Sequence, residues 1–294
     1  MIPIGMIFLA AFRLQFRWAL SAMFAMAAIT LWCVIKPLHV GVSAEFIGVT
    51  IQVSCTSIVA AYFVALVQER LAREAFLANY LLDIERAKSE RLLANVLPET
   101  IAHRLKDVPT TIADRFESAT VLFADIVDFT QLAAQLSSDE LVSLLNQIFS
   151  AFDALAEKYG LEKIKTIGDA YMAVAGVPKP DDKHAQAAAN MALELRTVIA
   201  GFKRETGEPL QLRIGLHSGP VIAGVIGTKK FIYDLWGDTV NTASRMESHG
   251  IQDQIQVTEA THALLQTEFT FSPPREIEVK GKGQMQVYSL LGKK

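Results

Sequence analysis

The sequence predicts a mixed α/β or α+β domain in the carboxyl-terminal part of the chain, preceded by a membrane region and a long connecting helix. Three features predict this organisation: two uncharged apolar runs near the amino terminus, a stretch at residues 68–97 without glycine or proline, and alternating strand and helix patterns from about residue 118. The chain has 294 residues, 51% hydrophobic and 20% charged. That composition excludes a disordered chain, a disulfide-built miniprotein and a collagen-like fibre.

The membrane region covers residues 1–67 and contains two predicted spans, at about residues 18–35 and 46–67. Neither run carries a charge, and each is long enough to cross a hydrocarbon core of about 30 Å as a helix. Buried core helices are the alternative, but two such runs in tandem, joined by a short loop with Pro37, favour a membrane hairpin. Four arginines flank the pair, whereas the loop holds only Lys36 against Glu45. The positive-inside rule therefore predicts a multi-pass protein of the plasma (inner) membrane, with both termini and the carboxyl-terminal domain in the cytosol.

The soluble part is acidic. Residues 68–294 carry 25 basic and 30 acidic side chains, and no basic stripe interleaved with aromatic residues is visible, so no nucleic-acid partner is expected. Both cysteines, Cys33 and Cys55, lie in the apolar runs. A disulfide framework and a cysteine-based zinc site are therefore excluded from the soluble part, which is consistent with a reducing cytosol.

A helical linker is predicted for residues 68–114. Its first part, residues 68–97, is rich in good helix formers, places apolar residues at three- and four-residue spacings, and ends at Pro98. Polar residues at 85, 88 and 89 interrupt the apolar stripe. The sequence therefore leaves two interpretations open: a parallel coiled-coil dimer, or a solvated helix lying against its own domain.

Strand and helix signals alternate through the carboxyl-terminal domain, residues 115–294. Residues 119–126 are β-branched and aromatic and predict a central strand. A capping box at Ser137 and Glu140, followed by an amphipathic run up to Gly160, predicts a helix with both ends marked. The remaining predictions are a β-hairpin at 163–167 and 170–175 around Gly168-Asp169, a helix at about 182–205, and strands at 211–217 and 255–258.

Two aspartates occupy positions from which they could meet. Asp125 stands near the end of a hydrophobic strand, where a half-buried carboxylate is costly without a cation, and Asp169 lies at the hairpin tip. If the two strands are neighbours, both carboxylates reach one sheet edge, where Mg²⁺ or Mn²⁺ would relieve their repulsion. The alternative is that Asp125 caps the following segment and Asp169 only forms the turn. Spacing alone leaves both interpretations open.

Five blocks of sequence resemble the successive motifs of the class III nucleotidyl cyclase catalytic domain. They are FADIVDFT at 123–130, EKIKTIGDAYMAVAG at 162–176, LRIGLHSGPVIAGVIG at 212–227, YDLWGDTVNTASRME at 233–247 and VKGKG at 279–283. They follow the family's order and spacing over about residues 115–292, and five concordant blocks are far more specific than one glycine pattern. The resemblance implies an α+β, ferredoxin-like (βαββαβ) fold and a membrane-anchored adenylate cyclase of the bacterial type.

The resemblance also implies a two-metal site. Asp125 and Asp169, assisted by the backbone carbonyl of Ile126, match the family's ligands of two divalent ions, Mg²⁺ or Mn²⁺. Such ions activate the ribose 3′-hydroxyl for in-line attack on the α-phosphorus and screen the triphosphate.

Four residues match the positions that contact phosphates and ribose. Arg245 matches the residue that meets charge growing on the α-phosphate, and Asn241, one helical turn earlier, would orient the ribose. Arg213 and Lys280 match the positions that grip the β- and γ-phosphates.

Base choice rests on Lys165 and Asp234, which match the base-recognition positions. Adenine offers an acceptor at N1 and a donor amine at C6, so a lysine donor and an aspartate acceptor complement it. Members of the family that make cyclic GMP typically carry glutamate and a small polar or cysteine residue there. The resemblance therefore implies ATP as substrate.

The family's site lies between two catalytic domains, and this chain holds the whole residue set in one domain. The resemblance therefore implies a homodimer with two equivalent sites, paired through catalytic domains, linker helix and membrane spans in the lipid bilayer. Two alternatives stay open: a guanylate cyclase, which Lys165 and Asp234 oppose, and a catalytically silent membrane signalling module, which erosion of a site position would favour.

Other conspicuous residues receive structural interpretations. His184 and His217 lack a second residue that would complete a proton relay. The glycines at 215, 219, 224 and 227 do not form a Walker loop and are interpreted as close packing at a strand-turn-strand segment.

Overall fold

The computed structural model describes residues 44–94, 97–107, 112–204, 206–227 and 231–294, together with residues 21, 24, 25, 27–29, 31, 32 and 35. It divides into two compact units, Met1–Glu90 and Arg91–Lys294.

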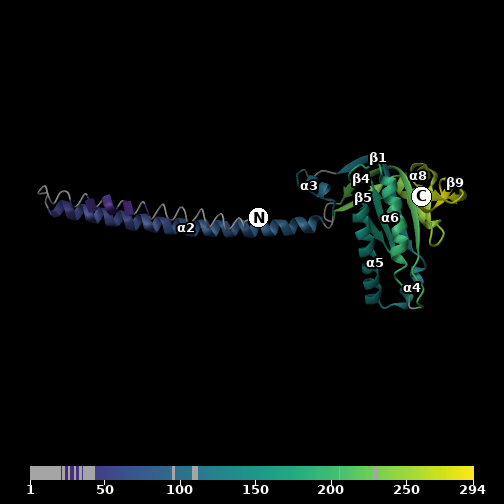
Figure 1. Cartoon of the computed structure of the whole chain (residues 1–294), viewed down its shortest axis with the longest axis horizontal. Helices are drawn as coiled ribbons and strands as arrows, with labels where there is room; N and C mark the ends of the chain where they lie inside the picture. Colours follow the sequence, from purple (N-terminus) through teal and green to yellow (C-terminus); the bar gives the residue numbers. More distant parts are fainter. Residues whose placement is uncertain are drawn as a thin grey trace. The chain divides into compact units, whose positions relative to one another are not determined.

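The amino-terminal unit is dominated by α2 (Ala44–Ala94), a single helix that contains the predicted span at 46–67 and the linker helix up to residue 94 (Figure 1). No glycine or proline follows Gly48 within α2, so nothing in the sequence interrupts it. Among the described residues this is the one helix long and apolar enough to cross a membrane. Half of the predicted span at 18–35 lies outside the described residues; those described within it are helical. The multi-pass topology therefore stays a prediction.

A nine-stranded sheet forms the carboxyl-terminal unit, in the order β2-β3-β1-β4-β6-β9-β7, with β5 on β4 and β8 on β9. The pairings are antiparallel except that of β4 with β6, which is parallel. The strands are β1 (Ala113–Ile126), β2 (Glu162–Ile167), β3 (Ala170–Ala175), β4 (Leu212–Ile226), β5 (Ile232–Trp236), β6 (Ile255–Thr258), β7 (Phe269–Phe271), β8 (Arg275–Val279) and β9 (Gly283–Lys293).

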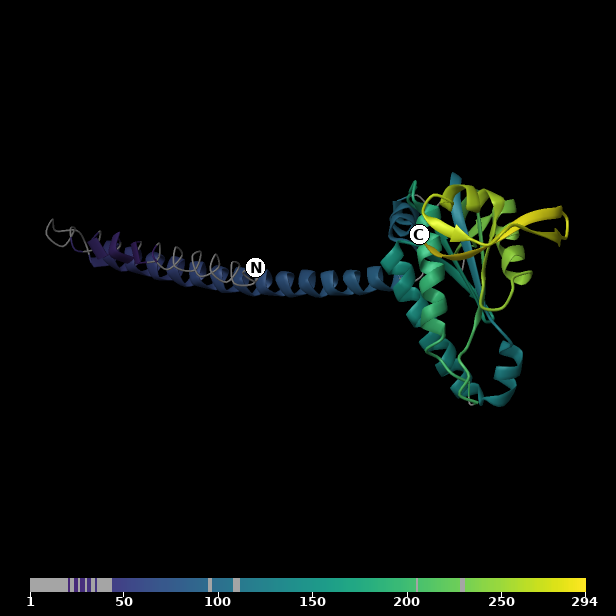
Figure 2. The same ribbon diagram turned by 45° about the vertical axis from the view of Figure 1, so that its right-hand side comes forward.

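The first part of this unit has ferredoxin-like topology. In chain order it runs β1, α5, β2, β3, α6, β4, and the sheet order β2-β3-β1-β4 is that of a βαββαβ fold. Helices α5 and α6 lie side by side along the sheet in both views (Figures 1 and 2). The predicted fold class is therefore confirmed. The helices are α3 (Glu99–Asp107), α4 (Phe129–Gln135), α5 (Ser138–Tyr159), α6 (His184–Ile199), α7 (Asp238–Ser248) and α8 (Glu259–Leu265).

From Ala119 onward, strand β1 is buried on both faces and separates two apolar layers. Leu122 and Ala124 pack with α5 and α6, whereas Val121 and Phe123 pack with α3, β5 and α7. A strand that is buried on both faces has a nearly continuous apolar sequence, which explains why residues 119–126 were correctly predicted as a central strand. β1 begins at Ala113, two residues before the predicted domain boundary.

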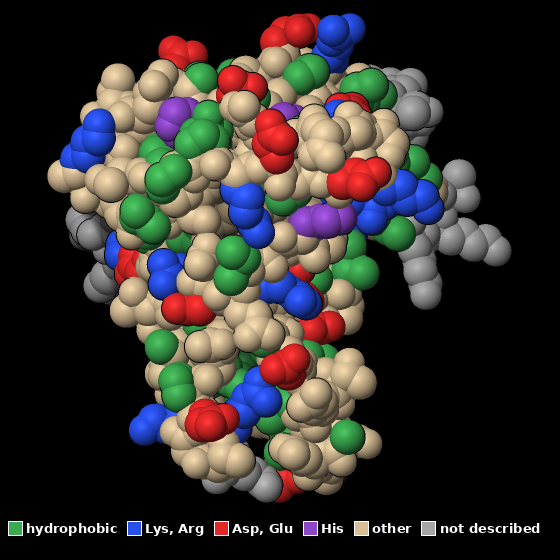
Figure 3. Space-filling model, turned by 90° about the vertical axis from the view of Figure 1, so that its right-hand side faces the viewer, with side chains coloured by type: hydrophobic (Ala, Val, Ile, Leu, Met, Phe, Trp, Pro, Cys, Tyr) green, Lys and Arg blue, Asp and Glu red, His purple; other side chains and the backbone are tan. Residues whose placement is uncertain are grey.

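Charged side chains of both signs are scattered over one face of this unit (Figure 3). Ion pairs such as Lys158–Glu194 (2.6 Å) and Arg196–Asp253 (3.0 Å) are partly solvent-exposed. Exposed pairs contribute about 1 kcal/mol at most, so the stability of the domain rests on its two apolar layers.

Local signals correctly marked α5 and the hairpin. The Ser137 hydroxyl accepts a hydrogen bond from the Glu140 amide, the Glu140 carboxylate accepts one from the Ser137 amide, and Gly160 ends α5 with a φ of 70°. Gly168 allows the turn between β2 and β3 with a φ of 64°. The second helix is shorter than predicted, because α6 ends at Ile199.

The strand-turn-strand interpretation at residues 211–227 is wrong, because β4 runs without interruption from Leu212 to Ile226. The close packing predicted at its glycines is confirmed at Gly215 and Gly224. A Cβ on Gly215 would lie 2.2 Å from the Glu247 amide nitrogen of α7, and one on Gly224 would lie 2.3 Å from the Ile112 carbonyl oxygen. Glycine here lets other backbone segments lie directly on the strand.

We expect Gly215→Ala to destabilise the domain by about 3 kcal/mol, since backbone atoms of α7 leave no room for the methyl group. Thermal unfolding of the detergent-solubilised chain measures the effect. Gly292→Ala is the matched control: no atom lies within 4 Å of its Cβ position, so a change within about 0.5 kcal/mol is expected. Equal unfolding midpoints for the two variants would contradict the close approach.

Candidate active site

Asp125 and Asp169 meet at one edge of the sheet. Strands β1 and β3 are antiparallel neighbours, and Asp125 stands opposite Ala170, the residue that follows Asp169. Burial, and next the charge of Asp125, raise the pKa of Asp169 to about 6. The sequence analysis required these two strands to be neighbours, and they are.

Arg213 partly neutralises this pair. It stands opposite Asp125 across β1 and β4, and its Nη2 donates to Oδ2 of Asp125 at 2.8 Å. Its Nε lies 3.5 Å from Oε1 of Glu247 at the end of α7, yet makes no hydrogen bond. Burial, followed by the charge of Asp125, raises the pKa of Glu247 to about 7. One guanidinium therefore faces three carboxylates.

The two aspartates fit a site for hard divalent cations. Within the described ranges, no group of three or more His, Cys, Asp or Glu side chains is arranged to hold a metal. Asp125 and Asp169 supply two carboxylates whose mutual repulsion an added cation would relieve, and such ions accept the rest of their ligands from carbonyls, water or phosphate. Ile126, the buried last residue of β1, is placed to offer such a carbonyl.

Lys165 and Asp234 form a second polar pair. Lys165 lies on β2 and Asp234 on β5, 69 positions apart, and the lysine Nζ lies 2.5 Å from Oδ2 of the aspartate. The Leu235 amide donates to the other carboxylate oxygen at 2.8 Å. The fold therefore brings together Lys165 and Asp234, the two residues that the resemblance to the cyclase family assigns to base recognition.

The remaining predicted residues are exposed. Asn241 and Arg245 lie one turn apart on α7, and Lys280 lies in the turn between β8 and β9. In that same turn, Lys282 forms an ion pair with Asp238, the first residue of α7. The pair ties the turn to the helix that bears Asn241 and Arg245.

The family described as adenylate and guanylate cyclase catalytic domain matches residues 111–292, more than half of the chain. The chain belongs to the class III cyclase family. The predicted family is confirmed, and the cyclase domain begins slightly before the expected residue 115.

Curated relatives include both kinds of cyclase. An adenylate cyclase of Mycobacterium tuberculosis is 45% identical over 253 residues, 86% of this chain and 56% of the relative. The rat guanylate cyclase soluble subunit beta-2 is 46% identical over 217 residues, 73% of this chain and 32% of the relative. The chain therefore spans about half the length, or less, of these relatives.

Solved structures agree with the fold assignment. The guanylate cyclase domain of RhGC from Catenaria anguillulae in complex with GTP matches with a TM-score of 0.59 and 42% identity, covering 62% of this chain and all of that chain. The adenylyl cyclase CyaB from P. aeruginosa matches with a TM-score of 0.57 and 28% identity, covering 62% of this chain and 97% of that chain.

Sequence reasoning missed Glu247 and the Lys282–Asp238 pair. Glu247 ends the SRME block, but only the fold shows that it is buried beside Arg213. The two histidines behave as expected of structural residues. His184 hydrogen-bonds to the Ser118 and Thr120 hydroxyls, and His217 to that of Thr258; burial lowers the pKa of His217 to about 4, so it is neutral at pH 7.

Proposed function

We propose that this protein is an adenylate cyclase that converts ATP to 3′,5′-cyclic AMP and pyrophosphate for intracellular signalling. The Lys165–Asp234 pair carries the proposal, because it presents a cationic donor and a carboxylate acceptor side by side. The adenine edge offers the complementary acceptor and donor. Identity alone does not decide between substrates, since adenylate and guanylate cyclases are similar to this chain to nearly the same degree.

The proposed chemistry is in-line displacement at the α-phosphorus. The ribose O3′ loses its proton and forms the new bond to phosphorus as the bond to the bridging oxygen breaks and pyrophosphate leaves. Asp125, Asp169 and the Ile126 carbonyl would hold divalent ions, which supply Lewis-acid activation of the hydroxyl and screening of the phosphates. Arg245 would meet the charge that grows on the α-phosphate oxygens, an interaction strongest in the transition state.

Other residues would position the nucleotide. Asn241, exposed on the same face of α7 as Arg245, would hold the ribose, while Lys280 would contact the β- and γ-phosphates as a point charge. Arg213 is assigned to the same phosphates, which it would contact after reorienting, because Asp125 occupies its Nη2 and its Nε is buried beside Glu247.

Product analysis tests the activity. The detergent-solubilised chain is incubated with ATP or GTP and Mg²⁺ or Mn²⁺, and the nucleotides are separated and identified by mass. We expect cyclic AMP and pyrophosphate in equal amounts and a higher kcat/KM with ATP. A higher kcat/KM with GTP would assign the chain to guanylate cyclases instead, and no turnover with either nucleotide would favour a silent signalling module.

We expect the double substitution Lys165→Glu, Asp234→Cys to lower the ATP:GTP ratio of kcat/KM by roughly a hundredfold, because buried polar groups that mismatch a base edge discriminate strongly. A rhodopsin-guanylyl cyclase core with converted specificity has been solved in complex with ATPαS, which supports the expectation that nucleotide specificity can be changed within this kind of domain. Lys158→Gln, which removes an exposed lysine paired with Glu194 on the helical face, is the control and should leave the ratio unchanged. An unaltered ratio in the double variant would remove Lys165 and Asp234 from base recognition.

We also infer that two copies pair through the β4–β5 hairpin. Ile222 stands opposite Trp236 and Ile226 opposite Ile232, and all four side chains are exposed, by 36–58%. This apolar face surrounds Asp234, which also lies on β5. Apolar side chains gathered on a strand pair favour burial against a second, identical copy.

We expect Ile232→Asp to lower cyclase activity about tenfold or more, because it places a charge in the proposed interface. Since Ile232 is 56% exposed, the thermal unfolding midpoint should hardly change. Val142→Asp, at an exposed position on α5, is the matched control and should retain activity. Full activity of the Ile232 variant would contradict pairing through this face.

We further propose that the apolar part of α2 anchors the chain in the inner membrane and that the cyclase domain lies in the cytosol. Arg70 and Arg73 follow the apolar part of the helix, as expected at a cytosolic end. In the linker part of α2, Leu71 and Leu82 are exposed on one side of the helix, about three turns apart, which leaves an apolar surface for the linker helix of a second chain.

A further inference from the structure

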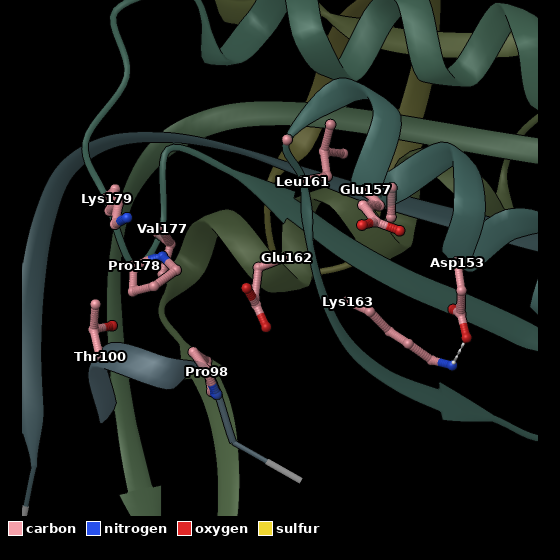
Figure 4. Close-up of a pocket in the computed structure, with 12 residues that line it drawn as sticks. Pro98, Thr100, Asp153, Glu157, Leu161, Glu162, Lys163, Val177, Pro178 and Lys179 are labelled. Atoms are coloured by element: carbon pink, nitrogen blue, oxygen red, sulfur yellow. Dashed lines mark hydrogen bonds and ion pairs between the residues drawn. The ribbon is translucent and has the colours of Figure 1, made fainter. Parts of the chain in front are cut away.

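A cavity of about 720 Å³ lies in the carboxyl-terminal unit, apart from every residue assigned to the candidate active site (Figure 4). Four segments line it: Pro98 and Thr100 at the beginning of α3, the end of α5, the start of β2, and residues 177–179 that follow β3. Its volume is within the range of sites that hold small organic molecules.

The charge inside this cavity is unbalanced. Asp153 is satisfied, because Lys163 Nζ donates to it at 2.7 Å and the Tyr171 hydroxyl at 2.8 Å. Glu162, by contrast, is half-buried and has no hydrogen bond or ion pair among the described residues. Figure 4 shows its carboxylate directed into the open space between Pro98 and Lys163. A half-buried carboxylate without a partner favours a cation.

Neighbouring groups strengthen this preference. The carboxyl-terminal end of α5 faces the cavity at Gly160 and carries the negative end of the helix dipole. Glu157 adds a carboxylate at this wall, and the charge of Lys163 is already offset by Asp153. Lys179, exposed on the opposite side, is the one lining cation without an ion pair in the described part of the chain.

The remaining walls are apolar. Pro98, Pro178 and the buried Val177 line one side of the cavity, and the buried side chain of Leu161 lines it near the end of α5 (Figure 4). We propose that this cavity binds an organic cation, with an ammonium or amidinium group paired to Glu162 and an apolar body between Pro98, Leu161 and Pro178. A hydrated inorganic ion would leave those apolar walls without contacts.

The cavity also lies close to Lys165 and Asp234. The role of these two residues in base recognition, and so the link to the cavity, rests on the proposed function. Glu162 precedes Lys165 on β2 by three positions. Its charge also contributes, after burial, to a raised pKa of Tyr233, whose buried hydroxyl has no partner and which directly precedes Asp234. A ligand paired with Glu162 would therefore lie beside α3, which belongs to the predicted linker 68–114, and beside β2, the strand that presents Lys165.

Binding is tested with 4-fluorobenzylammonium as probe, followed by ¹⁹F NMR on the detergent-solubilised full chain, with protein-free micelles as blank. We expect saturable binding that benzamidinium displaces. The neutral isostere 4-fluorobenzyl alcohol should bind at least tenfold more weakly, because it lacks the charge that Glu162 attracts. This readout needs no turnover, so its failure is distinct from failure of the proposed cyclase activity.

Glu162→Gln keeps the shape of the side chain and removes its charge, and it should weaken probe binding at least tenfold while the unfolding midpoint is retained. Glu259→Gln, in the first turn of α8 and outside the cavity, is the matched control and should bind like the unmodified chain. Equal binding by the Glu162 variant, equal binding of the alcohol, or no binding of the ammonium at about 10 mM would each overturn the proposal.

Discussion

Replacing Asp169 with asparagine is expected to reduce cyclic nucleotide formation by about a thousandfold without lowering the stability of the protein. The amide keeps the shape of the side chain but loses the charge that a divalent ion requires, and metal activation of this kind is worth several kcal/mol, or about three powers of ten in rate. Product formation over a series of Mg²⁺ and Mn²⁺ concentrations measures the loss.

The stability expectation follows from the direction of the pKa shift. Burial and Asp125 raise the pKa of Asp169 to about 6, above its ordinary value of 3.8, so the folded protein holds this proton more tightly than the unfolded chain. The contribution of Asp169 to stability therefore falls as pH rises from about 4 to 6 and stays unfavourable above that range. Asp169→Asn removes the unfavourable charge, and its unfolding midpoint at pH 7 should equal or exceed that of the unmodified chain.

Asp125→Asn is expected to differ from Asp169→Asn in its effect on stability. This aspartate accepts a hydrogen bond from Arg213 at 2.8 Å, so its replacement should lower both activity and stability. Asp139→Asn, in the exposed first turn of α5, is the control and should change neither. Addition of Mn²⁺ should raise the unfolding midpoint of the unmodified chain but not of either site variant. Normal turnover by the Asp169 variant at saturating metal would contradict the assignment of Asp169 as a ligand.

Sequence reasoning succeeded where local chemistry determines structure. The capping box at Ser137, the left-handed Gly160 and the Gly168 turn each depend on neighbours within a few residues, and each is present in the fold. The ferredoxin-like order and the family also followed from the sequence, because several separate motif blocks agree with one another.

Residues whose role depends on tertiary contacts were not predicted. The glycines of β4 indicated close packing, which is present, but the sequence did not show that the strand is continuous or that α7 and the segment before β1 are the parts that lie on it. Glu247 is an ordinary helical glutamate in the sequence and becomes part of the carboxylate cluster only because Gly215 lets α7 approach β4. Glu162 likewise stands out only when the cavity beside it is known.

The shared-site hypothesis makes the second prediction. An Asp125→Ala chain and an Arg245→Ala chain, each inactive as a homodimer, are coexpressed with different affinity tags and purified as the mixed dimer. If each site takes its aspartates from one chain and its arginine from the other, the mixed dimer contains one intact site of two, and about half of full activity should return. The exposed side chain of Arg245 on α7 is consistent with a role toward the partner subunit.

The matched control places both substitutions in the same chain and pairs that chain with an unmodified partner. This dimer carries the same two substitutions. If the sites are shared between chains, one of its two sites lacks Asp125 and the other lacks Arg245, so no activity should remain. A site built within a single chain reverses both outcomes: the first dimer is inactive, and the second keeps about half of full activity from its unmodified chain. Because the two arrangements give opposite results for dimers of equal composition, differences in folding or expression cannot imitate the shared geometry.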